Sequence, residues 1–157
     1  MKQESTVRYA FSQELLKKAE ALQEKLISWR RTIHRYAEPG GAEEKTAALV
    51  EKEAARLGLP VLDGGQTSRI AVLDTGRPGR TVLLRADMDA LPVPENPENL
   101  KGERCVVSEN PGFSHACGHD AHTAMRLGAM ELLSGMLEAL TRVMEFHLCF
   151  PMLMNNL

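Results

Sequence analysis

The sequence predicts an α/β domain in which helices pack against a sheet. Segments with helical and with strand periodicity follow one another in the order helix, helix, strand, strand, helix, strand. This order fits a layered α/β architecture better than a helical bundle or a β-sandwich. The 157 residues, of which 43% are hydrophobic and 25% charged, have the length and composition of one globular domain or of one piece of a larger domain.

Two helices are predicted in the N-terminal third of the chain. Ser12 is placed to cap the first helix, and apolar residues then recur on one helical face as far as Ile33. The turn-forming residues 39–41, Pro-Gly-Gly, end this helix. A second helix is predicted over residues 43–57, with Gly58 as its stop signal.

Two strands and a long loop are predicted next. The strands cover residues 69–74 and 81–85, and a Gly/Pro turn at residues 75–79 separates them. The apolar run at residues 82–84 is typical of a strand in the interior of a sheet. Residues 91–113 contain several prolines and little periodicity, so we expect a functional or flexible loop there.

The last two predicted elements are a helix and a strand. The helix begins near His119 and places Ala124, Leu127 and Leu132 on its apolar side. Alternate apolar residues over positions 142–150 predict a strand.

The composition disfavours several classes of function. A net charge of −2 and an aromatic content of 4% give no support to a surface that binds nucleic acid. No apolar run is long enough to span a bilayer, and the N-terminus lacks the apolar core of a signal peptide. The 3 cysteines form no disulfide framework. We therefore expect a cytoplasmic protein that binds neither nucleic acid nor membrane.

A cluster of metal-ligand residues is the most informative feature of the chain. Residues 114–122 read Ser-His-Ala-Cys-Gly-His-Asp-Ala-His and include three of the 5 histidines. A thiolate and several imidazoles at this density suit a borderline ion such as zinc. The alternative is a buried cysteine beside surface histidines at a helix start. The density of the cluster favours a metal site.

A second cluster follows the strand at residues 81–85. Residues 85–92 read Arg-Ala-Asp-Met-Asp-Ala-Leu-Pro, so Asp87 and Asp89 come at the sheet edge where α/β proteins bind ligands. A metal-bound histidine needs a carboxylate to fix its tautomer, and either aspartate could supply it. A solvated strand end with a turn is the alternative explanation. With the cysteine and histidines, these carboxylates indicate metal-assisted hydrolysis.

These two motifs resemble those of the M20 metallopeptidase family. They are most similar to its amidohydrolase branch, which contains hippurate hydrolases, N-acyl-amino-acid deacylases, indole-acetyl-amino-acid hydrolases and aminobenzoyl-glutamate hydrolases. Residues 29–38, Trp-Arg-Arg-Thr-Ile-His-Arg-Tyr-Ala-Glu, and residues 73–79 also resemble that branch. The resemblance extends from about Ile27 to Leu133.

The resemblance implies a metal-dependent enzyme that cleaves the amide bond of small N-acyl or N-aroyl amino acids. It implies two divalent ions per site, zinc or manganese, and a homo-oligomer for the complete family enzyme. Matched residue by residue, Cys117 and His119 correspond to metal ligands, and Asp87 corresponds to the catalytic carboxylate that orients the centre. For His122, a structural hydrogen bond on the helix is the expected role. Residues 1–157 would then form the N-terminal portion of a three-layer α/β/α zinc-peptidase-like catalytic domain, without the lid and dimerisation domain.

The end of the chain departs from the family pattern. Family members continue with a Glu-Glu pair, which supplies a base and a ligand, and with two later histidine ligands. Here no acidic residue follows Glu145, and His147 comes too early to be one of those ligands. Truncation or a change of reading frame would each explain this tail. The alternative to an amidohydrolase is therefore an inactive fragment or a metal-binding module, and we expect the isolated chain to lack amidase activity.

Overall fold

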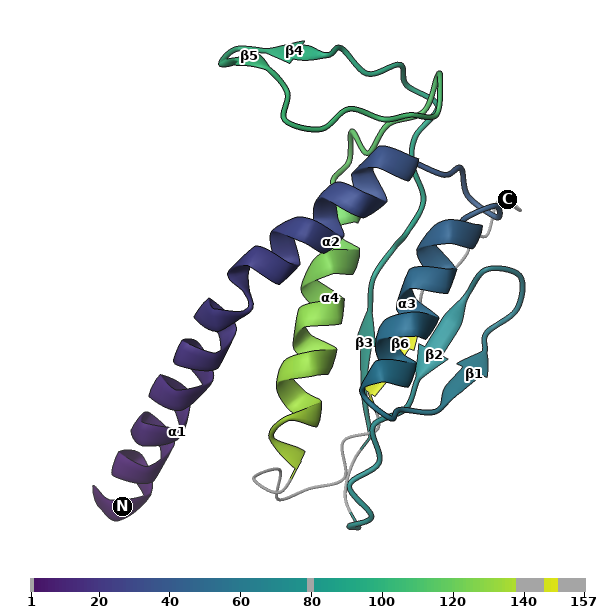
Figure 1. Cartoon of the computed structure of the whole chain (residues 1–157). Coiled ribbons are helices and arrows are strands. Elements are labelled where there is room, and N and C mark those ends of the chain that lie inside the picture. The colour runs from purple at the N-terminus through teal and green to yellow at the C-terminus, as the bar shows by residue number, and fades with distance from the viewer. Residues whose placement is uncertain (1, 79–80, 138–145, 150–157) are drawn as a thin grey trace.

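The computed structural model describes residues 2–78, 81–137 and 146–149 (Figure 1). Its elements are α1 (Lys2–Ala21), α2 (Gln23–Tyr36), α3 (Glu44–Arg56), β1 (Val61–Asp63), β2 (Arg69–Ala71), β3 (Val82–Arg85), β4 (Glu98–Asn99), β5 (Gly102–Glu103), α4 (His119–Ser134) and β6 (Phe146–Cys149). The alternation of helices and strands confirms the predicted α/β class. No helix in these residues is long and apolar enough to cross a membrane.

The single N-terminal helix predicted from Ser12 is two helices. The first, α1, begins at Lys2, and the second, α2, begins at Gln23. At Leu22 the backbone N–H donates to the carbonyl of Ala19, three positions back, at 3.1 Å. This tighter turn interrupts the regular helical ladder. Figure 1 shows that α1 and α2 form a long arm whose N-terminal end points away from the strands.

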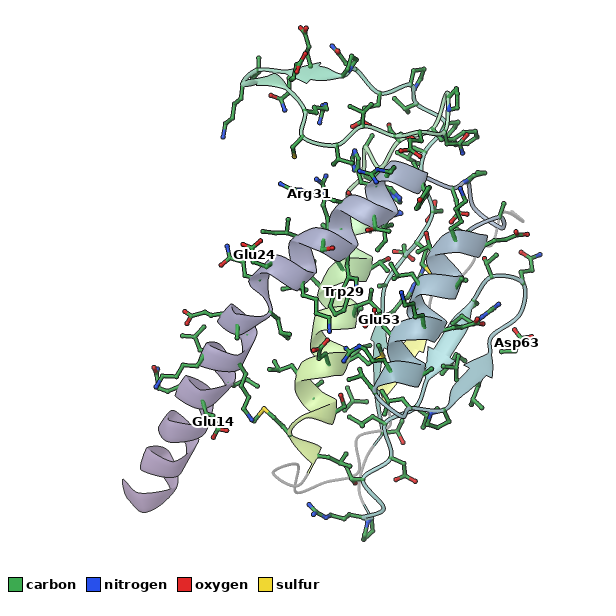
Figure 2. The ribbon with its side chains drawn as sticks, in the orientation of Figure 1. Glu14, Glu24, Trp29, Arg31, Glu53 and Asp63 are labelled. Atoms are coloured by element: carbon green, nitrogen blue, oxygen red, sulfur yellow. The ribbon has the colours of Figure 1, made fainter. Side chains whose placement is uncertain are left out.

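The hydrophobic core lies where α2, α3 and α4 meet the strands. Trp29, Val50 and Leu127, one from each helix, are at most 5% exposed. Figure 2 shows Trp29 directed toward the space between the helices, whereas the exposed Glu24 and Arg31 lie on the outer side of α2. Burial of each large apolar side chain contributes about 1.5–3 kcal/mol. The other buried members are Ala47, Ala54, Ala71, Ala86, Met88, Ala124 and Met130.

The strands within the described residues form three pairs. β1 lies antiparallel to β2 with Val61 opposite Ala71, and β3 lies parallel to β6 with Val82 opposite Phe146. The predicted strand at residues 142–150 is confirmed over β6, and its other residues lie outside the described part of the chain. β1 was not predicted, because three residues are too few to show an alternating pattern.

Two expectations for this region need correction. Val82 and Leu83 of β3 are 38% and 57% exposed, so the apolar run is not interior in the described structure. Of these three residues only Leu84 packs against the core, and its neighbour Leu83 points to the opposite face. The loop at residues 91–113 contains the short β4–β5 hairpin, with Glu98 opposite Glu103, which projects from the body in Figure 1.

Candidate metal centre

The first turns of α4 bind the backbone that follows β3. Arg126 Nε donates to the carbonyl of Arg85 at 2.8 Å, and Thr123 Oγ1 donates to the carbonyl of Asp87 at 2.9 Å. The Asp87 N–H donates to His122 Nδ1 at 3.2 Å, a hydrogen bond of the kind expected for His122. Residues three and four apart share a helix face, so α4 presents these groups together. The two predicted motifs are therefore adjacent in the fold.

A left-handed glycine sets the entrance to α4. Gly118, the N-cap residue, has φ of 91°, a backbone conformation that glycine adopts without steric cost. Its N–H donates to the carbonyl of His115 at 3.0 Å, which closes a turn before the helix. This turn leaves Cys117 exposed and makes His119 the first helical residue. The two residues predicted as metal ligands thus lie on either side of the boundary between loop and helix.

Asp89 holds the ring of His119. His119 Nδ1 lies 2.9 Å from the backbone carbonyl of Asp89 and 3.0 Å from its carboxylate Oδ1. Both partners accept hydrogen bonds, so Nδ1 carries a proton, and Nε2 is the ring nitrogen left for another partner. A carboxylate on the far nitrogen is the usual arrangement for a metal-binding histidine.

Asp87 has other contacts. Its carboxylate Oδ1 accepts a hydrogen bond from Arg85 Nη2 at 2.8 Å, and its Oδ2 lies 3.8 Å from His122 Nδ1. The catalytic role predicted for Asp87 stays a prediction. The carboxylate that contacts His119 is Asp89, the second of the two aspartates in the motif.

Cys117 and His119 fit a divalent metal by their chemistry. The thiol of Cys117 is exposed, and the imidazole of His119 is oriented with Nε2 available. A thiolate and a neutral imidazole are common ligands of zinc. Across the part of the chain that the structure describes, no three His, Cys, Asp or Glu side chains lie together closely enough to hold an ion. If Cys117 and His119 bind an ion, they would supply only part of its coordination shell.

A buried ion cluster lies beneath this segment. Asp120, which directly follows His119, is 1% exposed and accepts from Arg30 Nε at 2.7 Å. His34 Nδ1 lies 2.7 Å from the same carboxylate oxygen, Oδ2. Burial acts to raise the pKa of Asp120, but the hydrogen bond from His34 and the charge of Arg30 outweigh it and hold this pKa below its ordinary value.

His115 is a second buried histidine, and its surroundings differ from those of His34. It is 6% exposed, and neither ring nitrogen has a hydrogen-bond partner among the described residues. Burial lowers the pKa of His115 to about 4, so the ring is neutral near pH 7. Its ring centroid lies 6.1 Å from that of His34.

Comparisons with known proteins agree with these motifs. The sequence model of peptidase family M20/M25/M40 matches residues 83–150. The chain belongs to peptidase family M20. It is 46% identical over 110 residues to an N-acyl-L-amino acid amidohydrolase of Geobacillus stearothermophilus, covering 69% of this chain and 28% of that protein. It is 35% identical over 155 residues to a p-aminobenzoyl-glutamate hydrolase polypeptide of Escherichia coli K12, covering 72% and 36%.

Solved structures show the same M20 fold. A putative aminohydrolase from methicillin-resistant Staphylococcus aureus matches with a TM-score of 0.77 and 33% identity, covering 86% of this chain and 35% of that one. A dinuclear metal-binding peptidase of the M20 family from Bacillus subtilis matches with a TM-score of 0.72 and 31% identity, covering 82% and 35%. The chain spans about a third of the length of the relatives it matches.

The sequence motifs of this M20 member did not reveal the cluster around Asp120. Its partner His34 lies 86 positions away and belongs to a predicted helix with no ligand-like spacing. Arg30 and His34 do lie within residues 29–38, which resemble the family, but nothing in that segment names their partner. Only the packing of α2 against α4 brings these charges together.

Proposed function

We propose that this chain contributes Cys117 and His119 to a divalent metal centre that hydrolyses the amide bond of N-acyl or N-aroyl amino acids. The ion we propose is zinc or manganese, in a cytoplasmic enzyme that acts on small molecules and assembles as a homo-oligomer. Relatives named as N-acyl-L-amino acid amidohydrolase and p-aminobenzoyl-glutamate hydrolase support this substrate class. The chain would form the N-terminal portion of the catalytic domain.

The single observation that carries the proposal is the contact between Asp89 and His119. Asp89 is 5% exposed, so its carboxylate is held in place and fixes the imidazole tautomer. A partly exposed ring held by a carboxylate, two positions along the chain from an exposed thiol, supports a role for both residues as ligands.

The residues of the chain have separable tasks in such a reaction. When bound, a divalent ion supplies Lewis-acid activation of the amide carbonyl and of the attacking water. Asp89 keeps the proton on Nδ1 of His119 and so keeps Nε2 a donor of electrons. Asp87, half-buried beside the same segment, is the candidate catalytic carboxylate that holds or moves a proton.

A metal-binding module without catalysis is the second candidate. The observation that favours it is that, among the described residues, no third His, Cys, Asp or Glu side chain lies close enough to complete a metal site. The two candidates share metal binding and differ in turnover. Hydrolysis of N-acetyl or N-benzoyl amino acids by metal-loaded protein, lost in Cys117→Ser, would favour the enzyme.

Cobalt binding tests the metal centre directly. Cobalt(II) replaces zinc in such sites, and a coordinating thiolate gives a charge-transfer absorption band in the near ultraviolet. We expect this band when the chain is titrated with cobalt(II), because metal binding deprotonates Cys117. Cys117→Ser should abolish the band. Absence of the band in the unchanged chain would contradict the proposal.

A second cysteine provides the matched control. Cys105 is also an exposed thiol, in the loop after the β4–β5 hairpin. Cys105→Ser removes an exposed thiol without changing the residues 115–119. We expect it to leave the cobalt band unchanged. Loss of the band in this variant instead would assign the thiolate to Cys105.

A further inference from the structure

His34 lies at the junction of three segments of the fold. It belongs to α2, its Nδ1 contacts Asp120 of α4 at 2.7 Å, and its Nε2 contacts Glu95 of the 91–113 loop at 2.8 Å. The side chains of all three residues are at most 7% exposed. One imidazole therefore joins a helix, the start of a second helix and a long loop inside the protein.

Donation to both carboxylates takes a proton on each ring nitrogen, and Arg30 Nη2, which can only donate, also lies 3.2 Å from Nδ1. Ionised carboxylates only accept hydrogen bonds, and each lies within 2.8 Å of a ring nitrogen. The hydrogen bond to Asp120 is the largest factor that raises the pKa of His34, and Glu95 adds to it against the cost of burial. Burial acts to raise the pKa of Glu95, but the hydrogen bonds from the Ser108 backbone and from His34 outweigh it.

Charges of both signs surround the ring, and the charge of Arg30 acts to lower the pKa of His34. Besides the two carboxylates, the imidazolium is faced by Arg30, whose Nη2 lies 3.2 Å from Nδ1, and by the neutral ring of His115. Arg104 Nη1 lies 3.7 Å from Glu95 on the side of the loop. Buried charges persist when they are paired and hydrogen-bonded, as these are.

Glu95 anchors one limb of the loop. Its second carboxylate oxygen accepts the N–H of Ser108 at 2.7 Å, across the loop. The other limb is tied to the end of α2, where the N–H of Glu109 donates to the carbonyl of Arg35 at 2.7 Å and the side-chain amide of Asn110 donates to the carbonyl of Ala37. Release of Glu95 from His34 would free the limb that carries the β4–β5 hairpin.

We propose that His34, as an imidazolium, is a positioning residue that holds the 91–113 loop against the start of α4 and so fixes the segment from Cys117 to Asp120. The part that concerns the metal ligands rests on the proposed function. A neutral imidazole has one N–H, so it could satisfy only one of the two carboxylates. Loss of the charge would therefore separate the loop from the helix.

The unchanged chain supplies the first test. Nitrogen chemical shifts in NMR distinguish protonated from unprotonated ring nitrogens, and comparison with His34→Gln assigns the His34 signals. We expect both ring nitrogens of His34 to be predominantly protonated at pH 6.5, where an ordinary histidine is only about half protonated. One unprotonated nitrogen at that pH would overturn the proposal, whatever the behaviour of any variant.

Proteolysis of the loop supplies the second test. Trypsin cuts after Lys101 and Arg104, which lie in and beside the hairpin. Cleavage under native conditions tracks the population of the open loop. We expect His34→Gln to raise the cleavage rate at these sites by at least about fivefold, the factor expected when one buried contact is lost. An unchanged rate in a folded variant would overturn the proposal.

Two further variants separate positioning from general damage. His34→Lys keeps a positive charge and several N–H donors, so it should restore slow cleavage at least in part. Arg31→Gln removes an exposed charge from the same helix and should leave cleavage unchanged. Equal cleavage in His34→Gln and His34→Lys would contradict a role for the charge.

Cobalt titration links the loop to the metal ligands. We expect His34→Gln to weaken cobalt binding about tenfold, comparable to the loss of a supporting residue around a metal. If the unchanged chain binds no cobalt, the proposed function fails, while NMR and proteolysis still decide the role of His34. If cobalt affinity is unchanged while cleavage accelerates, His34 positions the loop but not the ligands, and that part of the proposal is wrong.

Discussion

His119 and Asp89 lie 30 positions apart in the sequence, yet the Nδ1 of one is 3.0 Å from the carboxylate Oδ1 of the other. The same nitrogen is 2.9 Å from the Asp89 backbone carbonyl, so the ring is held by two acceptors on one residue. The end of β3 thereby orients the first residue of α4. This relationship makes Asp89 the residue to test for control of metal affinity.

Asp89→Asn should weaken divalent metal binding by about 10- to 100-fold, because a neutral amide makes the imidazole of His119 less basic. The measurement is a cobalt or zinc titration by calorimetry. Asp63→Asn, a change at an exposed carboxylate labelled in Figure 2, should leave the affinity unchanged. The same titration of Asp87→Asn compares the two aspartates, and a larger loss there than in Asp89→Asn would assign the orienting role to Asp87.

The stability of the fold should fall as the pH rises above about 6.5. The pKa of His34 is raised above its ordinary value of 6.5, so the folded chain binds this proton more tightly than the unfolded chain. The stabilisation is complete below about pH 6.5 and is lost as the pH rises through the raised pKa. Urea unfolding between pH 6 and 9 measures this slope. In His34→Gln the slope over the same range should be absent, and identical profiles for the two proteins would argue against the prediction.

His115→Leu should leave the unfolding free energy unchanged or raise it by about 1 kcal/mol, because it removes two buried nitrogens that have no partner in the described structure. His34→Leu should lower it by about 3–5 kcal/mol, because it leaves two buried carboxylates without their shared donor. Urea unfolding at pH 6 compares the two variants. If both variants lose the same unfolding free energy, the hydrogen-bond partners of these two histidines do not decide how much each one contributes to stability.

Glu38→Ala should lower the unfolding free energy by about 1–2 kcal/mol. Its carboxylate accepts the N–H groups of Lys45 and Thr46 at 2.9 and 3.0 Å, so it caps α3 from outside the helix. Glu44→Ala removes an exposed carboxylate from the first turn of α3 and should cost only about 0.5 kcal/mol through the helix dipole. Thermal unfolding of both variants gives the comparison, and a Glu44 loss as large as that of Glu38 would exclude the capping role.

The sequence was sufficient for features that depend on neighbouring residues. The helix predicted over residues 43–57 is observed as Glu44–Arg56, and the helix predicted near His119 begins at that residue. Helical periodicity and a glycine at the end of a helix depend only on neighbouring residues. The helices they predict therefore do not depend on which distant segments pack together. The motifs at residues 85–92 and 115–125 likewise placed the chain in its family before any contact was known.

The tertiary structure alone decided which side chains meet. Both aspartates of the first motif were possible partners for a histidine, and the path of the backbone after β3 brings Asp89 to His119 and Asp87 to His122. The contact between His34 and Asp120 spans 86 positions and has no sequence signal. Such pairs form because packing of helices and strands brings distant residues into one low-dielectric interior. There a buried charge is costly unless an opposite charge pairs with it.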